Sequence, residues 1–234
     1  MKPHSSHCLA YSADINTRHL APTQRQAIEQ AQAAILARCG LPPLGKPVAA
    51  AHEAGHVVVM AALGDTITGA RLVRRACIGQ SEWVGVNSRT APTGCREYGT
   101  TADILLEPEC GIRLALAEVN GLAGERAAGL DHPSSSLDEI GKALMICCSL
   151  SGLFGGDPFQ VFAFLERIAD ALIAANRSTF DVVRGHLHRS GRLTGGEARR
   201  MPSSAARTPM PYAHNWCPVR LAHSAKSIRQ GGAS

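Results

Sequence analysis

The residues best suited to chemistry lie close together, in the segment His52-Glu53-Ala54-Gly55-His56. A spacing of four residues in a helix places both imidazoles on one face, one turn apart, where they can bind the same zinc ion. Zinc lowers the pKa of a bound water, and Glu53 is placed to take the proton as the hydroxide attacks a carbonyl. Glu53 can then deliver that proton to the leaving amine. The H-E-x-x-H pattern therefore predicts metal-assisted hydrolysis of a peptide bond.

The surrounding residues predict that this motif lies in a buried helix. Residues 48–63 are mostly apolar, and Gly64 and Asp65 follow them as a stop signal. Polar side chains in such a helix need partners, because burying an unpaired polar group is costly. Chance alone would produce the pattern in roughly 2% of chains with this composition. We therefore interpret His52 and His56 as zinc ligands and Glu53 as the general base.

The composition is that of a soluble globular protein. The chain has 234 residues, of which 45% are hydrophobic, 18% charged and 4% aromatic, and its formal net charge is +5. These values exclude fibrous and wholly disordered proteins and fit one globular domain with irregular ends. The charge excess is mild, and the basic C-terminal stretch lacks interleaved aromatics, so we expect no nucleic-acid partner.

The cysteines and the apolar stretches bear on the cellular location. The 8 cysteines include no C-x-x-C pair, which is typical of reduced thiols in the cytoplasm. The longest apolar stretch, residues 143–154, contains Ser and Gly and is too short to cross a bilayer. We therefore expect a cytoplasmic protein without a membrane span.

The remaining periodicities predict a mainly α (α+β) fold. A small strand pair, at 68–73 and 82–86 around a turn at Gly79, follows the H-E-x-x-H helix. The other predicted elements are helices, at 23–38, 109–130, 137–153, 158–176 and 178–189.

Several segments resemble the peptidase domain of the FtsH-type AAA zinc metalloproteases. The helix of that family typically reads HEAGHA followed by apolar residues, and here it reads HEAGHVVV. Residues 120–129, NGLAGERAAG, are similar to the family's Gly-Arg-Ala-Ala-Glu-Glu helix. Residues 172–200 are close to its closing pattern, an Asn-Arg helix followed by Leu-Thr-Gly-Glu. A strand pair and a Ser-rich approach to the next helix occur in the same order.

The resemblance suggests a division of the chain. It covers about residues 45–200, which we take as the FtsH-like peptidase domain. Residues 1–44 are expected to be a loose N-terminus with one lead-in helix, and residues 201–234 a disordered basic tail.

The third zinc ligand of the family is an aspartate near the start of the helix after a Gly-Ala-Ser turn. Here residues 134–140 read SSSLDEI, so two acids compete. Asp138 has the expected side chain at a helix N-terminus, where an anion is favoured. Glu139 has the better register with the apolar residues that follow. Adjacent helical positions point about 100° apart, so both cannot bind zinc equally well. We favour Asp138 and keep Glu139 as the alternative; both could also be solvated acids.

Two further features have alternative interpretations. Glu125 either supports a zinc-bound histidine through a hydrogen bond or is a surface acid. The strand at 82–87 either receives an extended peptide by edge pairing or is packed inside the sheet.

The resemblance implies a zinc metalloendopeptidase that acts on protein or peptide substrates. Full-length members carry a membrane anchor and an AAA ATPase module, and neither is found in these 234 residues. Such a domain would cleave flexible segments by itself or rely on a separate AAA ATPase partner. The family's peptidase assembles as a hexameric ring, which implies a homo-oligomer. The alternative is a catalytically inactive, FtsH-peptidase-like binding or regulatory protein.

Overall fold

The computed structural model describes residues 43–77, 80–90, 108–130, 137–154 and 156–200. The predicted lead-in helix at 23–38, the turn at Gly79 and the tail at 201–234 lie outside the described residues. Within them the chain is mainly helical with one small antiparallel sheet, which confirms the predicted fold class. In order, the elements are α3 (Lys46–Ala62), β1 (Thr66–Cys77), β2 (Gln80–Thr90), α5 (Pro108–Ala127), α6 (Leu137–Phe154), α7 (Pro158–Ala175), α8 (Arg177–Ser190), β3 (Arg192–Thr194) and α9 (Gly195–Arg200).

The helices and strands differ from the predicted ones mainly at their ends. Each long helix begins and ends within three residues of its predicted bounds. The strands β1 and β2 are longer than predicted because they pair along their whole length, from Thr66 opposite Thr90 to Cys77 opposite Gln80. The short strand β3 and helix α9 were not predicted.

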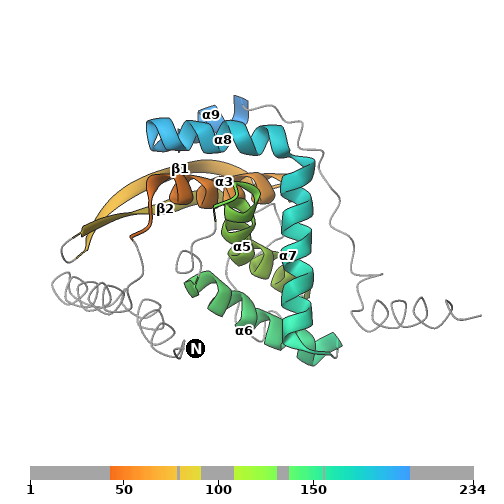
Figure 1. Cartoon of the computed structure of the whole chain (residues 1–234). Helices are drawn as coiled ribbons and strands as arrows, with labels where there is room; N and C mark the ends of the chain where they lie inside the picture. The colour runs from red at the N-terminus through yellow and green to blue at the C-terminus, as the bar shows by residue number, and fades with distance from the viewer. Residues whose placement is uncertain (1–42, 78–79, 91–107, 131–136, 155, 201–234) are drawn as a thin grey trace, which may run out of the picture.

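The sheet has the order β2-β1-β3 and is antiparallel throughout. Among the described residues, β2 is therefore an edge strand. Figure 1 shows the β1–β2 hairpin as a long curved ribbon with α3 running along it. Helix α3 packs against both strands of the hairpin, and α8 packs against α3. The sequence predicted the hairpin but not the side of the sheet on which α3 lies.

Helix α3 lies at the centre of the hydrophobic core, and its mostly apolar sequence explains why. Ala50, Val59 and Met60 are fully buried, and the helix contacts α5, α7, α8 and the β1–β2 hairpin. Burying such side chains contributes roughly 1.5–3 kcal/mol each for the larger ones. The helix that carries the H-E-x-x-H motif is thus held from several directions.

Two glycines allow α3 and α5 to approach each other closely. A Cβ atom on Gly55 would overlap the backbone oxygen of Asn120, and one on Gly124 would lie 2.9 Å from the Cα of Gly55. Because only glycine lacks a Cβ, these positions let the two backbones touch. The close crossing brings the side chains of α5 next to the motif.

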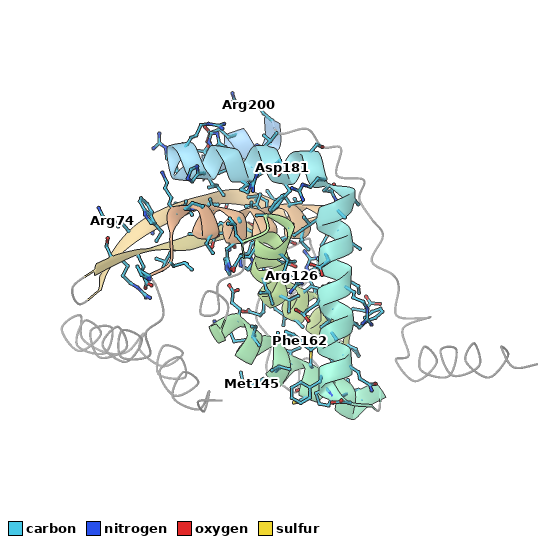
Figure 2. The ribbon with its side chains drawn as sticks, in the orientation of Figure 1. Arg74, Arg126, Met145, Phe162, Asp181 and Arg200 are labelled. Carbon is cyan, nitrogen blue, oxygen red and sulfur yellow. The ribbon has the colours of Figure 1, made fainter. Side chains whose placement is uncertain are left out.

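Helices α5, α6 and α7 form a second packed group. Arg126 at the end of α5, labelled in Figure 2, pairs with Glu166 at 2.7 Å and Asp170 at 2.9 Å, both on α7. Asp157 caps α7 by accepting a hydrogen bond from the backbone N–H of Phe159. Helix α6 packs against α5 and α7, so its first turn is positioned by them. None of the helices in the described ranges is long and apolar enough to cross a lipid bilayer.

Candidate metal centre

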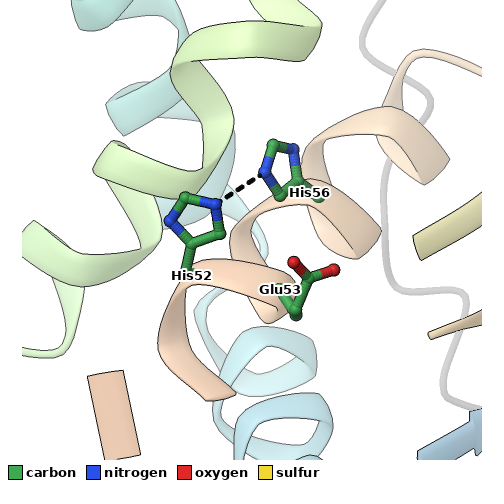
Figure 3. A group of neighbouring side chains, drawn as sticks. All are labelled: His52, Glu53 and His56. Carbon is green, nitrogen blue, oxygen red and sulfur yellow. Dashed lines mark hydrogen bonds between the residues drawn. The ribbon is translucent and has the colours of Figure 1, made fainter. Parts of the chain in front are cut away.

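The two histidines of the motif face each other on α3. Their ring centroids are 4.8 Å apart, and the Nε2 atoms of His52 and His56 are separated by 3.1 Å (Figure 3). His52, Glu53 and His56 are all buried, with exposed fractions of 8%, 3% and 6%. One ligand atom from each lies within 4.8 Å of the others. This buried group could hold a metal ion.

A third possible ligand comes from the first turn of α6. Glu139 Oε1 lies 3.2 Å from His52 Nε2 and 3.1 Å from His56 Nε2. Among the described side chains of α6, Glu139, the alternative in the sequence analysis, reaches both histidines. Asp138, the favoured residue, is the neighbouring residue in α6, and its side chain lies outside the described part of the chain.

The spacing of these three atoms fits a tetrahedral metal ion. Two imidazole nitrogens and one carboxylate oxygen stand 3.1–3.2 Å from one another. Ligands bound tetrahedrally to zinc at about 2.0–2.1 Å are about 3.3 Å apart. Two nitrogens and one oxygen are also the donor set of many catalytic zinc sites, which keep a fourth position for water. The donor set and its spacing are thus compatible with a bound metal ion.

Glu125 of α5 fixes the orientation of the His52 ring. His52 Nδ1 donates a hydrogen bond to Glu125 Oε1 at 2.7 Å. Since a carboxylate only accepts, Nδ1 carries the proton of this bond, so loss of the other ring proton leaves the lone pair on Nε2. Glu125 has an exposed fraction of 0%, so its alternative interpretation as a surface acid is wrong. Partners of this kind are usual for metal-bound histidines.

Gly121 of α5 provides the space for the same ring. A Cβ atom at this position would overlap the imidazole of His52. The ring therefore lies directly against the backbone of α5, one helical turn before Glu125. The Gly/Ala composition of this helix, which the sequence analysis used only as a family resemblance, has a structural cause.

Glu53 faces the sheet. Asn87 of β2 donates a hydrogen bond from Nδ2 to Glu53 Oε2 at 3.2 Å. Gly85, two residues earlier in the same strand, lies so close that a Cβ atom there would overlap the Glu53 carboxylate. Strand β2 thus contacts the predicted general base through one hydrogen bond and one backbone surface.

The charges at the site are strongly coupled. Burial raises the pKa of Glu53, partly opposed by the two histidines. Burial would lower the pKa of His52 and His56, but the charge of Glu139, the hydrogen bonds to glutamate side chains and the charge of Glu53 together outweigh it, so the pKa of both is raised. Burial would also raise the pKa of Glu139, but the adjacent imidazolium charges hold it well below its usual value. Glu139 is thus a carboxylate at neutral pH, the form that binds a cation.

In comparisons with known proteins, no protein-family model and no curated protein matches this chain. The functional interpretation therefore depends on the geometry of the site. Three contributing residues were not singled out by the sequence analysis: Gly85, Asn87 and Gly121. Of these three, only Gly121 could have been found from the sequence. It lies three residues before Gly124, and small residues at this spacing are typical of helices that cross closely.

Proposed function

We propose that this chain is a zinc metallopeptidase that hydrolyses peptide bonds in protein substrates. His52, His56 and Glu139 bind the zinc ion, and Glu53 is the general base. The observation that carries the proposal is the convergence of three ligand atoms 3.1–3.2 Å apart beside a buried glutamate. The resemblance to the FtsH-type peptidase domain supports it, with Glu139 as third ligand where that family has an aspartate.

Each residue has a separate task in the reaction. Zinc bound here would polarise the scissile carbonyl and lower the pKa of the attacking water. Glu53 takes the proton from that water and later gives it to the leaving nitrogen. The burial that raises the pKa of Glu53 helps it to hold the proton between these two transfers. Glu125 keeps the Nε2 lone pair of His52 directed at the metal through its bond to Nδ1.

The edge of β2 supports a peptide as the substrate. An extended chain can pair with an exposed strand edge through its backbone, without requirements on its side chains. The backbone at Gly85 lies against Glu53, so a chain paired there would bring a peptide bond close to the general base. Leu44 already accepts a hydrogen bond from the backbone N–H of Trp83 at 2.8 Å. Pairing would therefore extend from Gly85 toward Thr90.

The decisive experiment combines metal analysis with hydrolysis of fluorescein-labelled casein. Wild-type protein should contain one zinc per chain and release labelled peptides. Glu53→Gln should retain the zinc but lose hydrolysis by a factor of about 10² to 10⁴. Glu109→Gln, an exposed acid of α5, is the matched control and should behave like wild type. Unchanged turnover in Glu53→Gln would refute the assigned role.

The same experiment tests the alternative of an inactive binding or regulatory protein. A wild-type protein that binds zinc stoichiometrically, holds casein and releases no peptides would favour that alternative. A wild-type protein that binds no metal would contradict both the peptidase proposal and the ligand assignment. The expectations of an AAA ATPase partner, a homo-oligomer and a cytoplasmic location stay predictions.

A further inference from the structure

We propose that Asn87 is a positioning residue that holds the Glu53 carboxylate in one orientation beside the metal centre, in the space that Gly85 provides. This inference rests on the proposed function and adds a residue to it. Asn87 lies on β2, outside the H-E-x-x-H helix and outside the ligand set. It contacts the reacting groups only through Glu53.

A glutamate needs such a partner because its side chain has three rotatable bonds. On α3 the carboxylate of Glu53 could turn away from the histidines without breaking any bond of the helix. The hydrogen bond from Asn87 Nδ2 to Glu53 Oε2 opposes that rotation. Proton transfer requires the base within about 2.6–3.2 Å of the proton donor, so orientation directly affects the rate.

Strand β2 is well suited to hold Asn87 in place. Asn87 pairs with Ala70 of β1, in the middle of the hairpin. On one side of it, the backbone N–H of Trp83 bonds to Leu44 just before α3. On the other side, Arg89 donates a hydrogen bond to the buried Asp65 just after α3, at 2.5 Å. The strand is therefore anchored at both ends of the helix that carries Glu53.

Gly85 and Asn87 lie on the same face of β2, because the side chains of a strand alternate between its two faces. Side chains two residues apart point to the same face of a sheet, and here both positions face α3. Val86 and Ser88 between and after them are exposed. A side chain at position 85 would occupy the volume of the Glu53 carboxylate, whereas the glycine leaves that volume to it.

The chemistry of the amide is specific to this role. The Nδ2 group of asparagine only donates, and an ionised glutamate only accepts. An aspartate at position 87 has nearly the same shape but presents a second carboxylate, which would repel Glu53. The substitution Asn87→Asp therefore separates the hydrogen bond from mere packing.

The first test measures zinc content, kcat and KM of the full chain with a fluorogenic casein-derived peptide. Asn87→Ala should lower kcat about 10- to 100-fold and Asn87→Asp at least as much, with KM within about twofold of wild type and zinc unchanged. Glu109→Gln, an exposed acid of α5 outside the site, should match wild type. The inference is overturned if Asn87→Asp keeps wild-type kcat, or if its loss of kcat parallels a loss of zinc.

The second test needs no turnover and uses the metal-free protein. The unfolding equilibrium constants of wild type, Asn87→Ala, Glu53→Ala and the double variant form a cycle. A contact between the two side chains should appear as a coupling of about fivefold between the substitutions. Additive effects would overturn the inference. If the wild type hydrolyses no peptide, the proposed function fails, and this cycle still decides whether Asn87 holds Glu53.

Discussion

Glu139 Oε1 lies 3.1 Å from His56 Nε2, although 83 residues separate the two in the chain. The two histidines come from α3, which is held by the sheet and by α5 and α8. Glu139 comes from α6, which is held by α5 and α7. The candidate site thus joins two helices that come from distant parts of the chain, and both α5 and α7 contact α3 as well as α6.

Removing this third ligand should weaken zinc binding far more than removing its neighbour. We expect Glu139→Gln to lower zinc affinity by more than about 100-fold, because loss of a ligand should exceed the 10- to 100-fold cost of losing a supporting partner. Asp138→Asn should leave the affinity within a few-fold of wild type. Competition with a chromophoric chelator measures both. The opposite ranking would return the ligand assignment to Asp138.

The hydrogen bond between Glu125 and His52 should also contribute to zinc affinity. Without the acceptor at Nδ1, the ring can rotate or change tautomer, so Glu125→Ala should lower the affinity about 10- to 100-fold. Glu109→Ala, at an exposed position in the first turn of the same helix, is the control for helix effects. Equal zinc affinities for the two variants would show that Glu125 has only a packing role.

The effect of metal removal should depend on pH. The pKa values of His52 and His56 are raised above 6.5, so without metal their pairing with Glu139 stabilises the fold fully below pH 6.5 and is lost as the pH rises through the folded-state values. The pKa of Glu139 is lowered from 4.5, so its contribution is present above that pH and is lost on acidification. The metal-free protein is therefore stabilised by this cluster chiefly between pH 4.5 and 6.5.

Stabilisation of the fold by bound zinc should instead increase with pH, because zinc must displace the Nε2 protons of both imidazoles. A chelator should consequently lower the Tm much more at about pH 8 than at about pH 6. At 100 times the Kd, free zinc stabilises the fold by about 2.7 kcal/mol, which is large enough to follow by thermal unfolding. His52→Ala serves as the control and should unfold at the same temperature with and without chelator. A chelator effect that is equal at both pH values would contradict the coupling between protons and metal.

The sequence predicted the parts of the site that depend on local geometry. The four-residue spacing of His52 and His56 needs only a helix to bring the rings together. The third ligand was harder to predict. Asp138 and Glu139 are adjacent in α6 and point about 100° apart, so the way α6 packs decides which of them faces the histidines. Side-chain type favoured Asp138, whereas the register of the following apolar residues favoured Glu139.

The contacts of β2 with α3 could not be predicted from the sequence. Asn87 stands at the end of the strand considered at 82–87, and nothing in its neighbours indicates a contact with α3. The strand continues to Thr90 because β1 pairs with it over the same length. Which face of a hairpin meets a helix is decided by tertiary packing, so the role of Gly85 and Asn87 required the structure.

The close crossing of α3 and α5 gives a prediction about stability. Gly124→Ala would place a Cβ atom against the backbone of α3, 2.9 Å from the Cα of Gly55, where neither helix can yield without moving the other. Overpacking of this kind costs about 1–3 kcal/mol and exceeds the gain of up to about 1 kcal/mol that alanine normally brings to a helix. We expect a lower free energy of unfolding in urea, and weaker zinc binding because α5 carries the partner of His52.

Gly141 of α6 offers the matched control for that substitution. A Cβ atom there would have no neighbour within 4 Å, so Gly141→Ala adds helix propensity without a clash. This variant should be more stable than wild type by up to about 1 kcal/mol and should keep its zinc affinity. The two substitutions should therefore change the free energy of unfolding in opposite directions if α3 and α5 are in close contact. If Gly124→Ala also stabilised the protein, the backbones of α3 and α5 could not be in contact, and Glu125 would lose the position from which it supports His52.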